Sequence, residues 1–251
     1  MQNQRYLPML VGAWVLVSVW GCLSWKSQPQ SGVQPAYRAF VPGQVALLSC
    51  TEWPGLTESL RLHSQLSIGK RKLCEAMDAF VLAGFENQPY MMGFTPAAVE
   101  KLLQKQKQSA FLRLWPDIWL QSVHPSKRET APFSLYQDSI APYAKWQNWL
   151  QQFSVWTRYA DAVLIPFVAG IRQEIISDRG QKVALREAEA LWLLIDTNSG
   201  DLIWNGWHVA RLQNRQIYED QPPLFPEWRQ LSYRLLSPSL WSEYPGRVVD
   251  P

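Results

Sequence analysis

Apolar and polar positions alternate most clearly between residues 187 and 212, where two apolar runs flank a short polar turn. The first run, 187–195, becomes apolar on both faces towards its end, which indicates a strand covered on both sides. In the turn, Asp196 and Asn198 are residues whose side chains cap their own backbone, and Gly200 can adopt the positive φ that closes such a loop. The pattern predicts a β-hairpin whose turn is built from these residues.

The segment before this hairpin predicts its packing partners. An aromatic stripe at spacings of three and four predicts a helix over 139–159 that lies on the sheet. A strand follows over 160–176, and a second turn over 177–181 leads into the hairpin. Pro166 cannot donate a hydrogen bond to a neighbouring strand, so it predicts an edge position or a bulge in that strand. The chain from 139 to 212 therefore reads as a helix followed by a three-stranded antiparallel meander.

The first half of the mature chain predicts a strand–helix–strand order. A short apolar run over 44–50 is the first strand, and helical spacing over 70–83 predicts a helix that Gly84 ends. The connection before that helix is either helical or an extra hairpin. A short strand or loop covers 86–94. Thr95 then caps a further helix that begins with proline and continues to about residue 107.

Two later segments are less regular. Residues 109–142 combine a Trp-rich run, which predicts a short strand or helix, with a polar loop. This composition fits a partner-binding loop and fits a plain surface insertion equally well. The region 222–241 predicts a last helix that Pro238 limits.

These elements predict an α/β (α+β) fold with a mixed sheet that ends in an antiparallel three-strand meander, and with helices packed mainly on one face. A chain of 251 residues with 47% hydrophobic residues is long enough for one domain with a full core. We expect that single domain over 41–251. The 14 tryptophans favour a Trp-rich core over an interface role.

The N-terminus predicts a secretion signal. An uncharged run from Leu7 to Gly21 is too short to span a bilayer, which takes about 20 residues, and suits the core of a signal peptide. The run ends in Val-Trp-Gly-Cys at 19–22, which resembles a lipobox. We therefore expect residues 1–21 to be a signal peptide, Cys22 to carry lipid, including palmitate, and 22–40 to be a tether. An uncleaved anchor and a cleaved, unlipidated signal are the alternatives.

The residues after Cys22 bear on location. Leu23 and Ser24 follow the cysteine, with no Asp, which resembles the sorting pattern of Gram-negative lipoproteins transported to the outer membrane. We expect a lipid-anchored protein of the cell outer membrane that faces the periplasm. Its partners would be the lipid bilayer and an envelope protein complex. The net charge of +3 is too small to indicate nucleic-acid binding.

The order of residues in the hairpin also carries a family resemblance. A buried strand followed by Asp-Thr-x-Ser-Gly-Asp, two apolar residues and Trp, here Asp196 to Trp204, resembles the closing hairpin of a family of bacterial envelope lipoproteins. These are the curli-secretion-channel lipoproteins and their relatives, whose domain looks like the N-terminal α/β domain of the Tol-Pal translocation protein. The resemblance covers about 159–212. It implies an envelope α/β domain, and its members do different jobs.

The chain contains 3 cysteines, so lipidation of Cys22 leaves Cys50 and Cys74. Two remaining cysteines can pair in an oxidising periplasm, and consecutive elements are usually neighbours. A disulfide between them and two buried free thiols are therefore the two hypotheses.

No catalytic or metal-binding pattern accompanies these cysteines. The 3 histidines are scattered without metal-ligand spacing, and His208 reads as a structural histidine. The motif survey predicts no metal, no cofactor and no catalytic residue. The sequence thus favours a non-catalytic binding or assembly factor of an envelope complex. A subunit of a secretion or transport channel assembly and a periplasmic hydrolase or ligand-binding protein are the alternatives.

Overall fold

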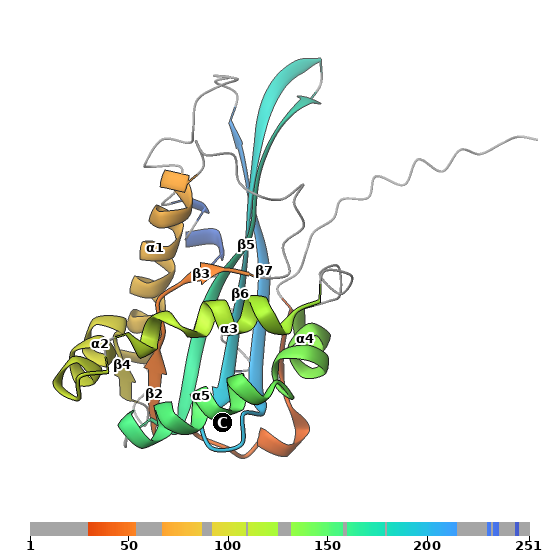
Figure 1. Cartoon of the computed structure of the whole chain (residues 1–251). Coiled ribbons are helices and arrows are strands. Elements are labelled where there is room, and N and C mark those ends of the chain that lie inside the picture. Colours follow the sequence, from red (N-terminus) through yellow and green to blue (C-terminus); the bar gives the residue numbers. More distant parts are fainter. Residues whose placement is uncertain are drawn as a thin grey trace, which may run out of the picture.

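The structure is a computed structural model that describes residues 30–53, 67–86, 92–108, 110–124, 132–157, 160–178, 180–214, 230–231, 233–235 and 244–245. Its centre is a seven-stranded mixed sheet of order β1-β7-β6-β5-β2-β4, with β3 paired to β5 outside this path (Figure 1). The strands are β1 (Gln30–Val33), β2 (Gln44–Leu47), β3 (Thr51–Glu52), β4 (Met92–Phe94), β5 (Ala162–Asp178), β6 (Gln181–Asp196) and β7 (Leu202–Asn214).

Helices cover both faces of this sheet unequally. The helices are α1 (Ser67–Glu86), α2 (Pro96–Lys105), α3 (Trp115–Ser122), α4 (Pro132–Leu135) and α5 (Ala144–Thr157), with a 3-10 turn over Phe111–Arg113 and a π-helix over Tyr136–Ile140. One face carries α2, α3 and α5, and α1 packs on the other. The predicted α/β class, with helices mainly on one face, is confirmed.

The two faces have different cores. Beneath α3 and α5 the core is aromatic and continuous, with rings such as those of Trp119, Trp146 and Phe153 fully buried. Beneath α1 it is mainly aliphatic, with Leu73, Met77 and buried alanines of β6. We call these the aromatic face and the α1 face.

The predicted meander is present and is longer than the periodicity suggested. The strands β5 and β6 pair antiparallel from Ala162 opposite Asp196 as far as Asp178 opposite Gln181. The strand β7 pairs with β6 up to Asn214. Beyond that register the β5–β6 hairpin continues without a third strand among the described residues and extends past the end of β7 (Figure 1).

The strand β2 is parallel to both of its neighbours, β4 and β5. The connection from β2 to β4 runs through α1 on one face, and the connection from β4 to β5 runs through α2, α3 and α5 on the other. The crossovers therefore diverge at the carboxyl end of β2, the kind of position at which open α/β sheets bind ligands.

The prediction that Pro166 lies on an edge strand or at a bulge is wrong. It lies in β5, an interior strand, opposite Trp192, and the bulge falls between Val168 and Gly170. The carbonyls of Leu164 and Val168 accept from the amides that follow β2 and β3, at 3.0 Å each. The backbone groups of every second residue in a strand point to the same side, so the nitrogen of Pro166 lies between these two hydrogen bonds. At this level the chain that connects β2 to β3 does not pair with β5. The missing N–H of proline costs no hydrogen bond there.

The helix α1 does not end at Gly84, as predicted, but runs to Glu86. The reason is tertiary packing, because the Phe85 side chain is buried in the α1-face core. A Cβ at Gly93 of β4 would lie 2.1 Å from the Phe85 ring, so glycine at that position makes room for it. Burial of one aromatic ring therefore outweighs the local tendency of glycine to end a helix.

The aromatic helix begins at Ala144 rather than at residue 139. Pro142 explains the difference, because proline lacks the amide that an uninterrupted helical ladder needs. The residues upstream form the π-helix instead, with Ala141 N–H donating to the Tyr136 carbonyl at 2.8 Å. A turn over 141–142 then leads into α5.

The expectation of a tether over 22–40 is wrong for its second half. The strand β1 adds Gln30 to Val33 to the sheet edge, antiparallel to β7, with Gln30 opposite Trp207. Tyr37 and Phe40 then pack edge-to-face against each other and onto the α1-face core. The folded domain therefore includes residues 30–40, ahead of the predicted start at residue 41.

Other predictions are confirmed or fall outside the described residues. Thr95 caps α2 by accepting from the Ala98 amide at 3.0 Å, and α3 shows that the Trp-rich run is helical. Leu231 and Leu235 of the predicted last helix are helical and buried. Residues 1–29, the connection over 57–66 and most of 222–241 lie outside the described ranges.

Candidate functional site

The turn between β6 and β7 has the chemistry that its residues predicted. The Asp196 carboxylate accepts from the amides of Asn198 and Ser199 at 2.7 and 3.1 Å. Gly200 has a φ of +76°, and a Cβ there would also lie 2.5 Å from the Gln147 side chain. Both the backbone conformation and the space therefore require glycine at this position.

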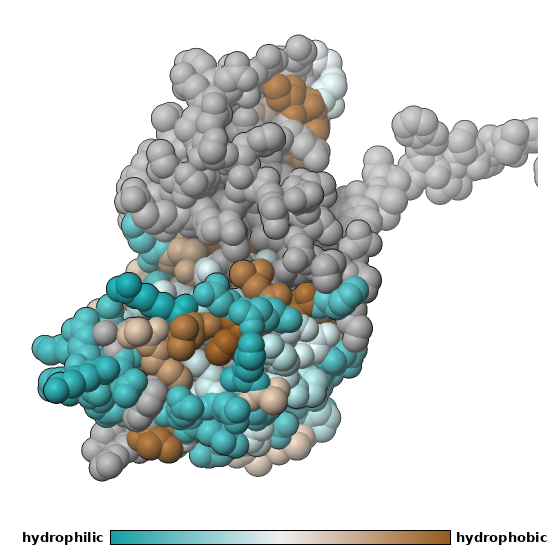
Figure 2. All heavy atoms as spheres, in the orientation of Figure 1, coloured by the Kyte–Doolittle hydropathy of each residue, from teal (hydrophilic) through white to brown (hydrophobic). Residues whose placement is uncertain are grey.

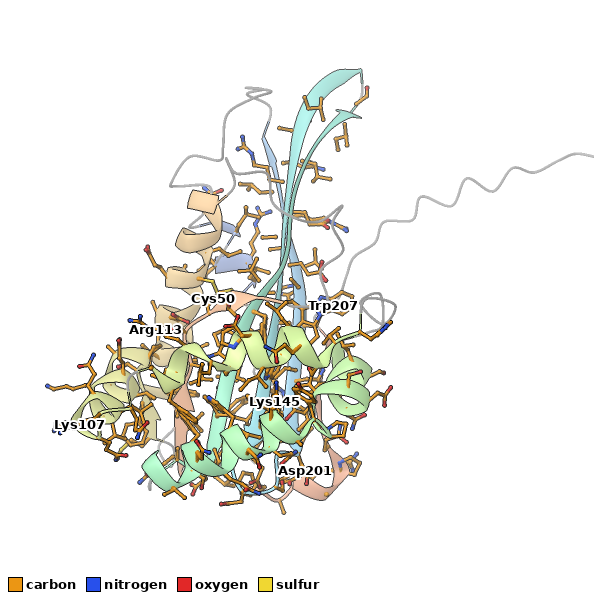
Figure 3. All side chains as sticks on the ribbon, viewed as in Figure 1. Cys50, Lys107, Arg113, Lys145, Asp201 and Trp207 are labelled. Carbon is orange, nitrogen blue, oxygen red and sulfur yellow. A yellow bond between two sulfur atoms is a disulfide. The ribbon has the colours of Figure 1, made fainter. Side chains whose placement is uncertain are left out.

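Three segments converge on this turn through side-chain hydrogen bonds. The Tyr136 hydroxyl donates to the Gly200 carbonyl at 2.7 Å. The Thr197 hydroxyl lies 2.9 Å from the Ala160 carbonyl, at the start of β5. The Tyr37 hydroxyl donates to Asp201 at 3.0 Å. Burial raises the pKa of Tyr136 well above its usual range. These bonds fix the lower end of the sheet, so the turn is structural (Figure 3).

Cys50 and Cys74 form a disulfide, with their Cα atoms 5.2 Å apart. It joins the chain just after β2 to the first half of α1, at the upper edge of the compact body (Figure 3). Cys22, the predicted lipidation site, lies outside the described residues.

An acidic side chain lies beside this disulfide. Asp78 is one helical turn after Cys74 and accepts a hydrogen bond from the Cys50 amide. Burial raises the pKa of its carboxyl to about 7, although the bond from Cys50 lowers it. One of its oxygens, Oδ1, is buried without a hydrogen-bond partner. The carboxyl therefore holds its proton through most of the acidic range.

The helix α3 presents an exposed apolar surface on a rigid base. Leu114 and Leu120 are 49% and 51% exposed. On the inner side, Trp115 and Trp119 are buried and pack edge-to-face at a centroid distance of 5.7 Å. Figure 2 shows hydrophobic atoms among mostly hydrophilic ones in this region of the front face. Residues 112–120 therefore offer apolar contacts without having to fold first.

A shallow hollow of about 50 Å³ adjoins this surface. It opens at the carboxyl end of β2, where the crossovers diverge, and is lined by Leu47, Leu48, Ser49, Pro96, Val99, Leu112 and Trp115. Among these residues only the Ser49 hydroxyl and the Trp115 indole carry polar side-chain groups. The hollow therefore suits an apolar side chain better than a charged small molecule.

Within the described ranges, no three His, Cys, Asp or Glu side chains gather in a way that could ligate a metal ion. His208 lies half-buried in β7, and its Nδ1 donates to the Leu235 carbonyl at 2.7 Å. This hydrogen bond gives the ring the structural role that its sequence position predicted. None of the described helices combines the length and apolar character needed to cross a bilayer.

Comparison with known proteins finds several solved structures of low similarity to this chain. No family model and no curated protein matches it. The PelC dodecamer from Paraburkholderia phytofirmans is 14% identical, with a TM-score of 0.36 over 85% of this chain and 96% of that one. The lipoprotein GNA1162 from Neisseria meningitidis is 14% identical, with a TM-score of 0.34 over 71% and 88%. The hypothetical protein CT253 from Chlamydia trachomatis is 10% identical, with a TM-score of 0.39 over 80% and 98%.

All three TM-scores lie below 0.5 and all three identities below 25%. The function of this chain therefore has to be inferred from its own residues. Membership in the curli-secretion lipoprotein family stays a prediction.

Two features of the site could not be predicted from the sequence. Asp78 lies in a helix of ordinary sequence pattern, and nothing local shows that Cys50 donates to it. The exposed surface of α3 was also missed, because a run rich in Trp and Leu does not reveal which side turns inward. The earlier hypothesis of a partner-binding segment over 109–142 was the nearest signal.

Proposed function

We propose that the protein is a lipid-anchored envelope lipoprotein that faces the periplasm and binds another envelope protein without catalysing a reaction. The observation that carries the anchor is the Val-Trp-Gly-Cys sequence at the end of an uncharged run, which places the acceptor thiol at Cys22. The short distance along the chain to β1 supports it, because Gln30 already belongs to the sheet. The folded domain would then be held directly at the membrane.

Metabolic labelling with a palmitate analogue tests the anchor. Wild-type protein should incorporate the label and Cys22→Ser should not, whereas Ser24→Ala, a matched change two residues away, should label normally. Cell fractionation of the same strains should place the wild type with outer-membrane markers. Label that is absent from the wild type, or that persists in Cys22→Ser, would overturn the proposal.

The partner-binding role is supported by the surface over residues 112–120. Exposed apolar side chains that gather in a patch mark interaction sites more often than singly scattered ones do. Here the exposed Leu114 is the N-cap residue of α3 and the exposed Leu120 lies within this helix. Ring contacts such as that of Trp119 with Trp53 at 5.8 Å hold the inner side of the helix in place. A pre-organised helix face loses little entropy on binding, which favours a protein partner.

Site-specific photocrosslinking in intact cells tests this surface. A photoreactive residue in place of Leu114 should capture one defined envelope protein, and the same residue in place of the exposed Glu100 on α2 should not. Equal capture at both positions, or at neither, would contradict the assignment. Turnover by the purified protein on an esterase and glycosidase panel would instead support the hydrolase alternative.

A further inference from the structure

The order and direction of the strands show at which end of the sheet the N-terminal segment joins. That end is the one at which the β5–β6 hairpin has its tip, at residues 175–183. Because β1 is antiparallel to β7, with Gln30 opposite Trp207 and Val33 opposite Trp204, the chain enters β1 from the direction in which β7 runs. The strand β7 runs away from the turn at Asp201 and towards Asn214. Figure 3 shows Asp201 at the lower end of the sheet and Trp207 part-way along it. The chain that carries Cys22 therefore joins the sheet at the end of β1 that points towards the tip of the hairpin.

The lengths of the two segments can be compared along one axis. Cys22 and Gln30 are eight residues apart (30 − 22), and a fully extended chain spans at most about 28 Å over that distance. In the register of the sheet, Gln30 lies level with Trp207 and Leu191. From Leu191 to Gln181 the hairpin rises ten residues (191 − 181), or about 33 Å. The hairpin is thus at least as long as the longest reach of the anchor.

The free end of the hairpin also has a suitable surface. Ile175 is 41% exposed, and Ser177 and Gly180 are exposed beside it. Ile176 is half-buried and lies opposite Val183. Figure 2 shows hydrophobic atoms at the surface of this end. Exposed apolar side chains at the end of an extended element favour the boundary between lipid headgroups and acyl chains over water.

We propose that the free end of the β5–β6 hairpin contacts the bilayer that holds Cys22, with Ile175 and Ile176 at the headgroup boundary. This inference rests on the proposed lipid anchor and adds an orientation to it. The domain then contacts the membrane at two places, the lipid on Cys22 and the tip of the hairpin. The opposite end of the sheet, with the turn at Asp196 to Asp201, faces away from the membrane. The surface of α3 lies between the membrane and the turn at Asp196 to Asp201, and it stays open to a periplasmic partner.

Spin labelling of the lipidated full-length protein tests this orientation. One nitroxide is attached at Ser177→Cys, and a control is attached at Asn198→Cys, an exposed position in the opposite turn. Both proteins are reconstituted in vesicles of phosphatidylethanolamine and phosphatidylglycerol. The label at 177 should lose collisions with an aqueous nickel chelate and gain collisions with oxygen, and the label at 198 should behave as it does in water. Equal aqueous collisions at both positions would overturn the inference.

A flotation assay on the same samples separates the two proposals. Protein that floats with vesicles while the label at 177 stays aqueous keeps its anchor and refutes the hairpin contact. Protein that fails to float refutes both. Ile175→Asp should restore nickel collisions at 177 without loss of flotation, because the exposed Ile175 contributes to membrane contact and little to folding. Unchanged collisions in this variant would refute the role of Ile175.

Discussion

The two faces of the sheet are stabilised in different ways. The aromatic face is filled by rings in contact, such as Trp146 and Trp149, which stack at a centroid distance of 5.1 Å. Its buried tyrosine is satisfied, because Tyr136 both donates to Gly200 and accepts from the Trp146 indole. The α1 face instead combines aliphatic packing with a disulfide and with Asp78, whose Oδ1 has no partner. The first face gains its stability mainly from ring packing, with the Tyr136 hydrogen bonds in addition, whereas the second carries a buried carboxyl that opposes folding at neutral pH.

The largest effect should come from a ring of the aromatic face. Phe153 is fully buried and stacks on Trp149 at 5.0 Å. Phe153→Ala should lower the free energy of unfolding by about 3–5 kcal/mol, because it leaves a cavity in a closely packed core. Urea denaturation followed by tryptophan fluorescence measures the loss. Leu73→Ala on the α1 face is the matched control, and a greater loss there would reverse the comparison.

The buried carboxyl should make the α1 face sensitive to pH. The native pKa of Asp78 is about 7 against an ordinary value of 3.8, so the native state holds the proton longer than the unfolded state. Stability should therefore fall as pH rises from about 4 to 7, by up to about 4 kcal/mol. Asp78→Asn cannot ionise and should be more stable than the wild type by nearly that amount at pH 8.

The free energies of unfolding of Asp78→Asn and of the wild type should converge at low pH. At about pH 3, below the ordinary pKa of 3.8, the side chain at position 78 is mostly neutral in the native and unfolded states of both proteins, so their denaturation midpoints should approach each other. A constant difference between the two proteins from pH 4 to pH 8 would show that ionisation of Asp78 does not cause it. Glu75→Gln, a change of an exposed acid on the same helix, serves as the control.

Removal of the disulfide should also act on the α1 face. The Cys50–Cys74 bond closes a loop with a sequence separation of 24. Joint replacement of both cysteines by alanine should lower the free energy of unfolding by about 3 kcal/mol, because the unfolded chain gains freedom. Alkylation under denaturing conditions checks the bond itself. Full labelling of both cysteines without reductant would contradict it.

The smallest effect should come from the satisfied tyrosine. Tyr136→Phe removes the hydroxyl that joins the π-helix to the Gly200 carbonyl and leaves the ring in place. The loss should be about 1–2 kcal/mol, since one buried carbonyl and one indole N–H then lack a partner. Thermal unfolding monitored by circular dichroism measures it. A loss as large as that of Phe153→Ala would show that hydrogen bonds, and not ring packing, dominate the aromatic face.

The sequence predicted the features that local chemistry determines. The turn at Asp196 to Gly200 and the cap at Thr95 each depend on a few adjacent residues, and both were located correctly. The stripe of α5 was also clear, although Pro142 shifted its start. Such features need no knowledge of the tertiary fold.

Features that depend on distant residues were missed or left open. Pro166 was assigned to an edge or a bulge because the gap between β2 and β3 is a property of the assembled sheet. Gly84 did not end α1 because the Phe85 side chain packs against Gly93 of β4, which lies in a different element. The strand β1 was read as tether because its four residues, Gln-Ser-Gly-Val, carry little apolar signal, and the pairing with β7 alone makes them a strand.

The early start of β1 limits where a lipid-anchored domain can act. With Cys22 in the membrane, eight residues of chain confine the domain to a thin layer next to the bilayer. A partner embedded in the same membrane shares that layer, so its effective concentration rises and weak contacts through α3 suffice to hold it. A soluble periplasmic partner gains no such advantage and would need affinity of its own.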